Sequence, residues 1–137
     1  MTEFQKTIDS VTGYKANRQK YADEVLANPE LFLELILLCF QALNKNHSKA
    51  CWVLELVCYE KLEWLQEHLD FFSSNIKNLT DESALRSISK VCWLLTISHF
   101  KKKEISLTEN QLLQITESCF DWLIKDTKVA SKCCAIR

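Results

Sequence analysis

Glycine and proline are almost absent from this 137-residue chain, which contains only Gly13 and Pro29. A β-sandwich or β-barrel needs many tight turns, and those turns depend on glycine and proline. A phosphate-binding loop of the dinucleotide or P-loop type needs several glycines within one short motif. The composition therefore excludes these folds and loops, and it indicates a helical protein.

Cysteine is abundant, but its pattern does not indicate disulfides or a metal site. The chain has seven cysteines, which is an odd number, and no Cys-x-x-Cys pair. No secretory segment opens the sequence, and the three histidines are not at zinc-ligand spacing from the cysteines. Most of the cysteines lie in apolar helical stretches, where a reduced thiol behaves as a small hydrophobe. We therefore expect a reducing, cytoplasmic location, with no metal and no cofactor.

An excess of charge and a long hydrophobic run are also missing. Seventeen basic residues nearly balance eighteen acidic ones, and the net charge is −1. No overall charge would therefore attract the chain to nucleic acid or to a membrane. The longest apolar run, residues 31–43, is shorter than the roughly 20 residues that span a bilayer. As a helix this run is apolar on nearly all sides, which predicts that it packs between neighbours.

Helical periodicity and capping residues divide the chain into short segments. Asn28, Pro29 and Glu30 are typical of a helix start, and residues 108–111 (TENQ) match a capping box. The first twelve residues are expected to fray, and residues 101–107 are expected to form a charged loop. The predicted helices are 14–26, 28–43, 47–59, 62–76, 80–100, 108–126 and 127–137.

A six-residue motif occurs three times at nearly constant spacing. Residues 48–53 (SKACWV) recur as 89–94 (SKVCWL) and as 131–136 (SKCCAI), at offsets of 41 and 42 residues. The segments between the copies, 69–72 (LDFF) and 120–123 (FDWL), also resemble each other. A helix pair that repeats at this period is typical of an α-solenoid, in which stacked units share one continuous core.

Residues 126–135 (DTKVASKCCA) resemble the second-helix signature of HEAT repeats. In that family an acidic residue and a basic residue six positions later form a polar ladder between repeats, and Asp126 and Lys132 have this spacing. Asp81 lies too early for Lys90, and only asparagines precede Lys49. The resemblance therefore implies a ladder that is partial in this chain.

From about Tyr14 onward, the chain resembles a group of small bacterial HEAT-like proteins of the Bacteroidetes type, whose function is unknown. Residues 50–57 (ACWVLELV), 81–86 (DESALR) and 119–123 (CFDWL) carry this resemblance. Some members are labelled adenylosuccinate lyase. Enzymes of that superfamily need a flexible Gly/Ser-rich catalytic loop, which this sequence lacks.

We therefore predict one all-α domain over residues 1–137, built as an α-solenoid of the HEAT/armadillo type with six to seven helices. The repeats are roughly 13–43, 46–77 and 80–126, followed by a partial repeat at 127–137. The last repeat is incomplete, and an uncapped solenoid end exposes apolar surface. We expect this C-terminal end to form a homo-oligomer contact.

The alternating helices differ in charge. The predicted inner helices, 46–59, 82–103 and 127–137, sum to a net charge of +7. The predicted outer helices, 28–43, 60–77 and 108–126, sum to −7. This pattern predicts a basic concave face that could receive an anionic partner, although lysines late in a helix or in a solvated loop also have purely structural roles.

The candidate binding residues on that face are Lys49, Trp52, Arg86, Lys90, Trp93, Lys128 and Lys132. The two tryptophans occupy equivalent repeat positions, so they either pack between repeats or stack on a ligand. A Glu55–Arg86 ion pair that bridges two repeats is a further expectation. No histidine lies near a serine or cysteine in a recognisable catalytic motif, so we predict no catalytic residues.

The sequence leaves three functions to compare. The first is a non-enzymatic interaction module that binds a protein or peptide segment. The alternative is a nucleic-acid-binding protein, similar to the HEAT-like DNA alkylation-repair proteins, that uses the basic face. A lyase activity has no support from any residue.

Overall fold

The structure is a computed structural model of the chain, and it describes residues 3–12, 15–41 and 43–125. Within these ranges the chain forms helices and no β-strand. None of the helices in these ranges has the length and apolar character needed to cross a membrane. The elements in chain order are α1 (Glu3–Asp9), α2 (Lys15–Ala27), the 3-10 turn η1 (Pro29–Leu31), α3 (Phe32–Cys39), α4 (His47–Lys61), the 3-10 helix η2 (Leu62–His68), α5 (Leu69–Asn75), the 3-10 turn η3 (Ile76–Asn78), α6 (Glu82–Ile97), the π-turn η4 (Ser98–Lys102) and α7 (Glu109–Lys125).

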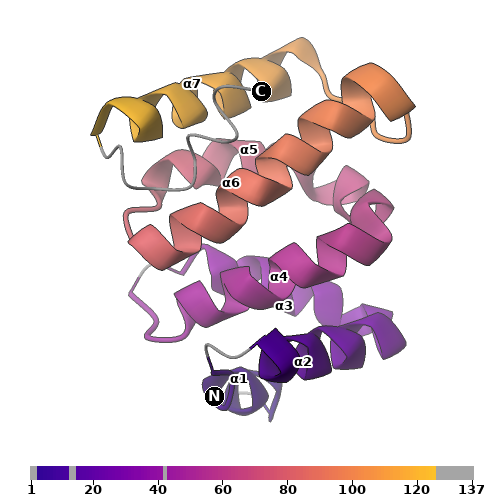
Figure 1. Cartoon of the computed structure of the whole chain (residues 1–137), viewed down its shortest axis with the longest axis vertical. Coiled ribbons are helices and arrows are strands. Elements are labelled where there is room, and N and C mark those ends of the chain that lie inside the picture. The colour runs from indigo at the N-terminus through magenta and orange to yellow at the C-terminus, as the bar shows by residue number, and fades with distance from the viewer. Residues whose placement is uncertain (1–2, 13–14, 42, 126–137) are drawn as a thin grey trace.

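The helices form two rows (Figure 1). In the first row α4 packs against both α2 and α6, so these three helices lie side by side in chain order. In the second row α5 contacts α7, and α3 meets α5 where the Phe40 ring packs edge-on against Phe71 and Phe72. Contacts of α4 with α3 and η2 join the two rows. The all-α prediction is confirmed.

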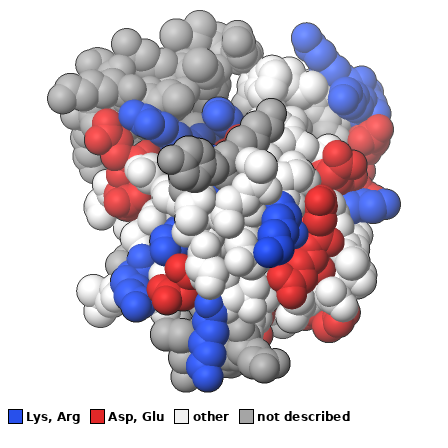
Figure 2. All heavy atoms as spheres, turned by 60° about the horizontal axis from the view of Figure 1, so that its bottom comes forward, with Lys and Arg blue, Asp and Glu red and all other residues white. Residues whose placement is uncertain are grey.

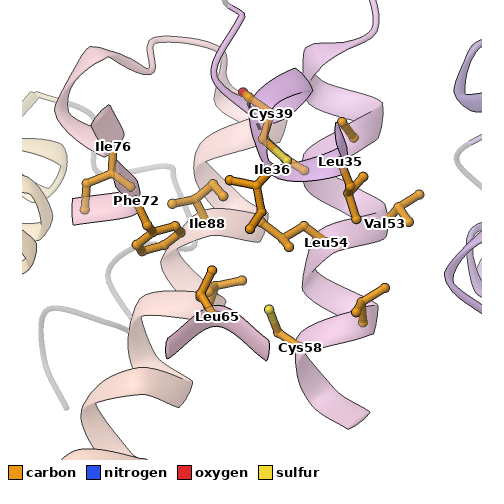
Figure 3. Packing of buried hydrophobic residues seen from close by; sticks show 14 of the residues in the cluster. Leu35, Ile36, Cys39, Val53, Leu54, Cys58, Leu65, Phe72, Ile76 and Ile88 are labelled. Atoms are coloured by element: carbon orange, nitrogen blue, oxygen red, sulfur yellow. Dashed lines mark hydrogen bonds between the residues drawn. The ribbon is translucent and has the colours of Figure 1, made fainter. Parts of the chain in front are cut away.

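The core lies between the two rows (Figure 3). Leu35, Ile36 and Cys39 of α3 face Leu54 of α4. On the α5 side, Phe72 and Ile76 lie beside Ile88 of α6, and Leu65 of η2 and Cys58 of α4 lie below them. All of these side chains are buried. Because apolar residues recur every three or four positions, each helix turns one such stripe inward.

The first copy of the repeated motif lies at the start of α4, whereas the second copy begins in the middle of α6, the helix that packs against α4. Cys51 in the first copy and Cys92 in the second are buried, whereas Trp52, Trp93 and Leu94 are only partly buried. The third copy, the predicted helix at 127–137 and the predicted homo-oligomer contact lie outside the described residues. The described part therefore places the first two copies on neighbouring helices, at different distances from the helix starts.

Local capping signals correspond to real helix starts in two places. The Thr108 Oγ1 accepts from the Gln111 backbone N–H at 3.1 Å, while the Gln111 Oε1 accepts from the Thr108 N–H at 2.9 Å. This reciprocal pair is the predicted capping box. Asp81 caps α6 by accepting from the Ala84 N–H at 2.9 Å. Asn28 differs, since its side chain donates backward to the Glu24 carbonyl and makes no N-cap hydrogen bond.

The beginning of the chain corrects one expectation. Residues 1–12 are predicted to fray, but Glu3–Asp9 form α1, and Phe4, Ile8 and Val11 are buried in the core cluster. A backbone carbonyl of this segment, that of Asp9, accepts a hydrogen bond from the Lys49 Nζ at 2.9 Å. Burial of these three apolar side chains stabilises the folded segment. Such burial cannot be inferred from the position of the segment near the terminus.

The segment after α6 is less exposed than its charges suggest. The helix ends in η4, and Lys103 then adopts a left-handed conformation with φ 59°. Ile105 is only 1% exposed, and its N–H donates to the Ser98 Oγ at 3.1 Å. Leu107 is also buried, and its N–H donates to the His99 Nδ1 at 3.1 Å. The predicted charged loop is therefore fixed to the core by two apolar side chains.

Candidate functional site

A small polar hollow of about 210 Å³ lies where α2, α4 and α6 meet. We call it the α2–α4–α6 hollow. Three of the predicted binding residues, Trp52, Arg86 and Lys90, lie around it. The full set of lining residues is Arg18, Trp52, Glu55, Ser83, Arg86, Ser87 and Lys90.

Helical spacing explains why these side chains converge. On α6 the four lining residues follow one another at steps of three, one and three positions, from Ser83 to Lys90, so they share one face of the helix. On α4, Trp52 and Glu55 are three positions apart and also share a face. Side-by-side packing of the two helices brings these faces together.

Glu55 is the buried carboxylate of the hollow. It is only 8% exposed, and it accepts a hydrogen bond from the Tyr59 hydroxyl at 3.0 Å. Its Oε2 lies 3.5 Å from the Nζ of Lys90. Burial, with a further contribution from the charge and hydrogen bond of Glu55, raises the pKa of Tyr59 to about 12.

The predicted partner of Glu55 needs correction. Glu55 does bridge α4 and α6, but its ion pair is with Lys90, not with Arg86. The two candidates lie one helical turn apart on α6, so the register between the helices decides between them. A sequence does not contain that register. Arg86 is exposed and lines the same hollow.

Arg18 of α2 was not among the predicted site residues. Its guanidinium carbon lies 4.5 Å from the centre of the Trp52 ring, which is a cation–π contact. Its Nε is buried and has no hydrogen-bond partner among the described residues. Arg18 could have been predicted from the assignment of residues 14–26 to the first repeat, because this assignment places α2 beside α4, the helix that carries Trp52.

The other predicted binding residues lie elsewhere. Lys49 donates to the Asp9 carbonyl and does not line the hollow. Trp93 is half-buried on α6, and it is not part of the lining either. Lys128 and Lys132 lie outside the described residues. The structure therefore brings together three of the seven candidates.

The charges around the hollow favour an anion. Arg18, Arg86 and Lys90 oppose the single carboxylate of Glu55, which leaves an excess of two positive charges. Figure 2 shows basic and acidic side chains interspersed over the face that it presents. Of the described basic residues in the predicted inner helices, Arg86 and Lys90 line the hollow, Lys49 bonds the Asp9 carbonyl, and Lys101, Lys102 and Lys103 are exposed after α6.

A second hollow, of about 310 Å³, has the opposite character. It lies between η1, α3 and η2, on the row predicted to be acidic. Three exposed carboxylates line it together with the half-buried Trp64 and His68. These carboxylates belong to Glu30, Glu63 and Glu67.

Side chains that could perform chemistry have structural roles here. The Nδ1 atoms of His99 and His47 make hydrogen bonds to backbone groups of the loops beside them. In the described residues no three His, Cys, Asp or Glu side chains are grouped so that they could hold a metal ion. Burial raises the pKa of the Cys39 and Cys58 thiols, which keeps both in the neutral form.

No protein-family model matches the chain, and no curated protein and no solved structure matches it either.

Proposed function

We propose that this chain is a non-enzymatic protein-interaction module of the HEAT-like helical-repeat type, which binds an acidic protein segment at the α2–α4–α6 hollow. One observation carries the proposal. Three neighbouring helices contribute Arg18, Trp52 and Arg86 to a single hollow that has an excess of positive charge. A binding face that extends over successive helices is the usual recognition surface of repeat proteins.

The contacts of the two repeated lysines support a repeat arrangement. Lys49 and Lys90 occupy the same position in the two copies of the motif. Lys49 reaches back to Asp9, in the segment before α2, and Lys90 reaches back to Glu55 on α4. Each lysine thus binds an element of the preceding part of the chain. Only the Lys90 contact is with a carboxylate, as in a polar ladder between stacked units, because Lys49 bonds the backbone carbonyl of Asp9.

Arg18 and Arg86 are the side chains that favour binding over a purely structural role. Glu55 already forms an ion pair with Lys90 and accepts a hydrogen bond from Tyr59, so it is a poor partner for two further cations. Arg18 stacks against Trp52, its Nε has no hydrogen-bond partner in the described part of the chain, and Arg86 is exposed. A guanidinium presents several donors in a fixed plane, which suits a carboxylate-rich segment.

The alternative to peptide binding is nucleic-acid binding. Duplex binding needs contacts to several phosphates along a continuous basic surface. The interspersed acidic residues in Figure 2 and the small volume of the hollow favour a short peptide instead. The two functions also differ in salt dependence, because release of counterions makes DNA binding fall steeply as salt is added.

The test compares three fluorescent probes by anisotropy: an Asp/Glu-rich peptide, a peptide of the same length with Asn and Gln in place of the acids, and duplex DNA. Each is measured at about 50 and 200 mM salt with the wild type, the R18Q/R86Q variant and the matched K45Q variant. Lys45 forms an ion pair with Asp9 on the surface and is not part of the hollow, so it controls for loss of charge.

We expect the acidic peptide to bind more tightly than the amide peptide, to remain bound at 200 mM salt, and to lose at least tenfold in affinity with R18Q/R86Q but not with K45Q. The alternative is supported if DNA binds more tightly than the peptides at about 50 mM salt and loses most of this affinity at about 200 mM salt. No binding of either anionic probe refutes both functions.

A further inference from the structure

We infer that the α2–α4–α6 hollow is a site for a phosphate monoester, so that the bound segment carries a phosphorylated side chain. This inference deepens the proposed function and rests on it for the identity of the partner as a protein. The binding of the phosphate group itself depends only on the residues that line the hollow.

The charge balance within the hollow points to a dianion. Glu55 lies 3.5 Å from Lys90 and neutralises it, which leaves the charges of Arg18 and Arg86. A phosphate monoester carries a charge of about −1.5 to −2 near neutral pH, whereas a carboxylate carries −1. One phosphate therefore matches the uncompensated charge, and a single Asp or Glu side chain matches half of it.

The donors of the hollow also suit a phosphate. Arg18 comes from α2 and Arg86 from α6, so two different helices supply the guanidinium groups. The hydroxyls of Ser83 and Ser87 line the wall on α6, and each can donate one hydrogen bond. Three phosphate oxygens can accept from donors that come from several directions, while a flat carboxylate has two oxygens in one plane.

Among the lining residues, Arg18 gives the strongest indication that a hydrogen-bond acceptor is missing. Its buried Nε has no hydrogen-bond partner among the described residues, and a buried donor left unpaired is unfavourable. Stacking on Trp52 at 4.5 Å fixes the plane of the guanidinium, so less conformational entropy is lost when a ligand binds. An oxyanion in the hollow would supply the acceptor that this side chain lacks.

The experiment uses phenyl phosphate and benzoate, two probes that share an aromatic ring and differ in the anionic group. Each is titrated into the labelled full chain, and the Arg Nε–Hε and Trp indole signals are followed by NMR. The variants are R18Q/R86Q, S83A/S87A and, as the control, K45Q. Thermal unfolding checks that each variant is folded. A second arm compares the acidic peptide with the same peptide carrying one phosphoserine.

We expect phenyl phosphate to bind at least tenfold more tightly than benzoate and to shift the Arg18 and Trp52 signals. R18Q/R86Q should lose at least tenfold in affinity for phenyl phosphate, S83A/S87A a smaller factor, and K45Q less than twofold. The phosphopeptide should bind at least tenfold more tightly than its unphosphorylated form.

Several results overturn the inference. Equal affinity for phenyl phosphate and benzoate does so, as does an R18Q/R86Q variant that is folded and binds phenyl phosphate like the wild type. If the acidic peptide binds at the hollow while phenyl phosphate does not, the inference fails and the proposed function stands. If phenyl phosphate binds while neither peptide does, the phosphate site stands and the proposed function fails.

Discussion

Lys90 on α6 places its Nζ 3.5 Å from the Oε2 of Glu55 on α4, and this ion pair joins the two helices that carry the first two copies of the motif. The Glu55 side chain is 10% exposed and the Lys90 side chain 48%. The pair is therefore half-desolvated. Its carboxylate also holds the Tyr59 hydroxyl, so Glu55 links the polar hollow to the end of α4.

The coupling between Glu55 and Lys90 should be measurable but modest. In a double-mutant cycle of E55Q and K90Q we expect a coupling of about 0.5–1 kcal/mol in the free energy of unfolding, because one partner is largely solvated. Denaturant unfolding of the four proteins measures it. The Asp9–Lys45 pair, which is more exposed on both sides, is the control and should couple more weakly. A larger coupling for the control pair contradicts the role given to Glu55.

Tyr59 should make stability fall at high pH. Burial, followed by the charge and hydrogen bond of Glu55, raises its pKa to about 12 from the ordinary value of 10. Because the folded state holds the phenol proton more tightly, the stabilising contribution is complete below about pH 10 and is lost as the pH rises toward 12. Phenolate absorbance of the wild type minus that of Y59F gives the midpoint. E55Q should lower it, and an unchanged midpoint in E55Q contradicts the assigned cause.

Phe72 should be one of the most sensitive positions in the core. Its side chain is fully buried and packs edge-on against Phe40, so F72A leaves a cavity where the two rows of helices meet. We expect a loss of about 3–5 kcal/mol in the free energy of unfolding. Phe100 is 57% exposed, and F100A should change stability by about 0.5 kcal/mol or less. Similar effects of the two substitutions would argue against this core.

The cysteines of the described region should be unreactive in the folded chain. Cys39, Cys51, Cys58, Cys92 and Cys119 are all buried. For Cys58, burial followed by the nearby charge of Glu55 raises the thiol pKa, so raising the pH to about 9 should hardly speed alkylation. Mass spectrometry of a C133S/C134S variant, labelled before and after denaturation, tests this. Rapid labelling of Cys58 in the native state contradicts its burial.

Local signals were predictable from the sequence because the interacting residues are close together along the chain. The capping box of Thr108 and Gln111 is confirmed, and the helix start predicted at residue 80 agrees with the cap that Asp81 forms on α6. The side-by-side packing of α4 and α6 agrees with the proximity expected for equivalent repeat segments. These features depend on spacing, which a sequence contains.

The features that the sequence does not reveal depend on register and on contacts between distant segments. The choice of Lys90 over Arg86 as the partner of Glu55 depends on how far α6 is shifted along α4. The contact of Arg18 with Trp52 depends on how α2 packs against α4. The burial of α1 likewise requires surfaces formed by other helices. Neither composition nor periodicity contains this information.

The most direct test of the proposed interaction face is to map the binding of the acidic peptide, residue by residue, from backbone and side-chain NMR shifts of the full chain. The proposal predicts that the largest changes cluster at Arg18, Trp52, Arg86 and Lys90 and disappear in R18Q/R86Q. Changes that cluster instead along α3, α5 and α7, or that persist unchanged in that variant, would contradict it.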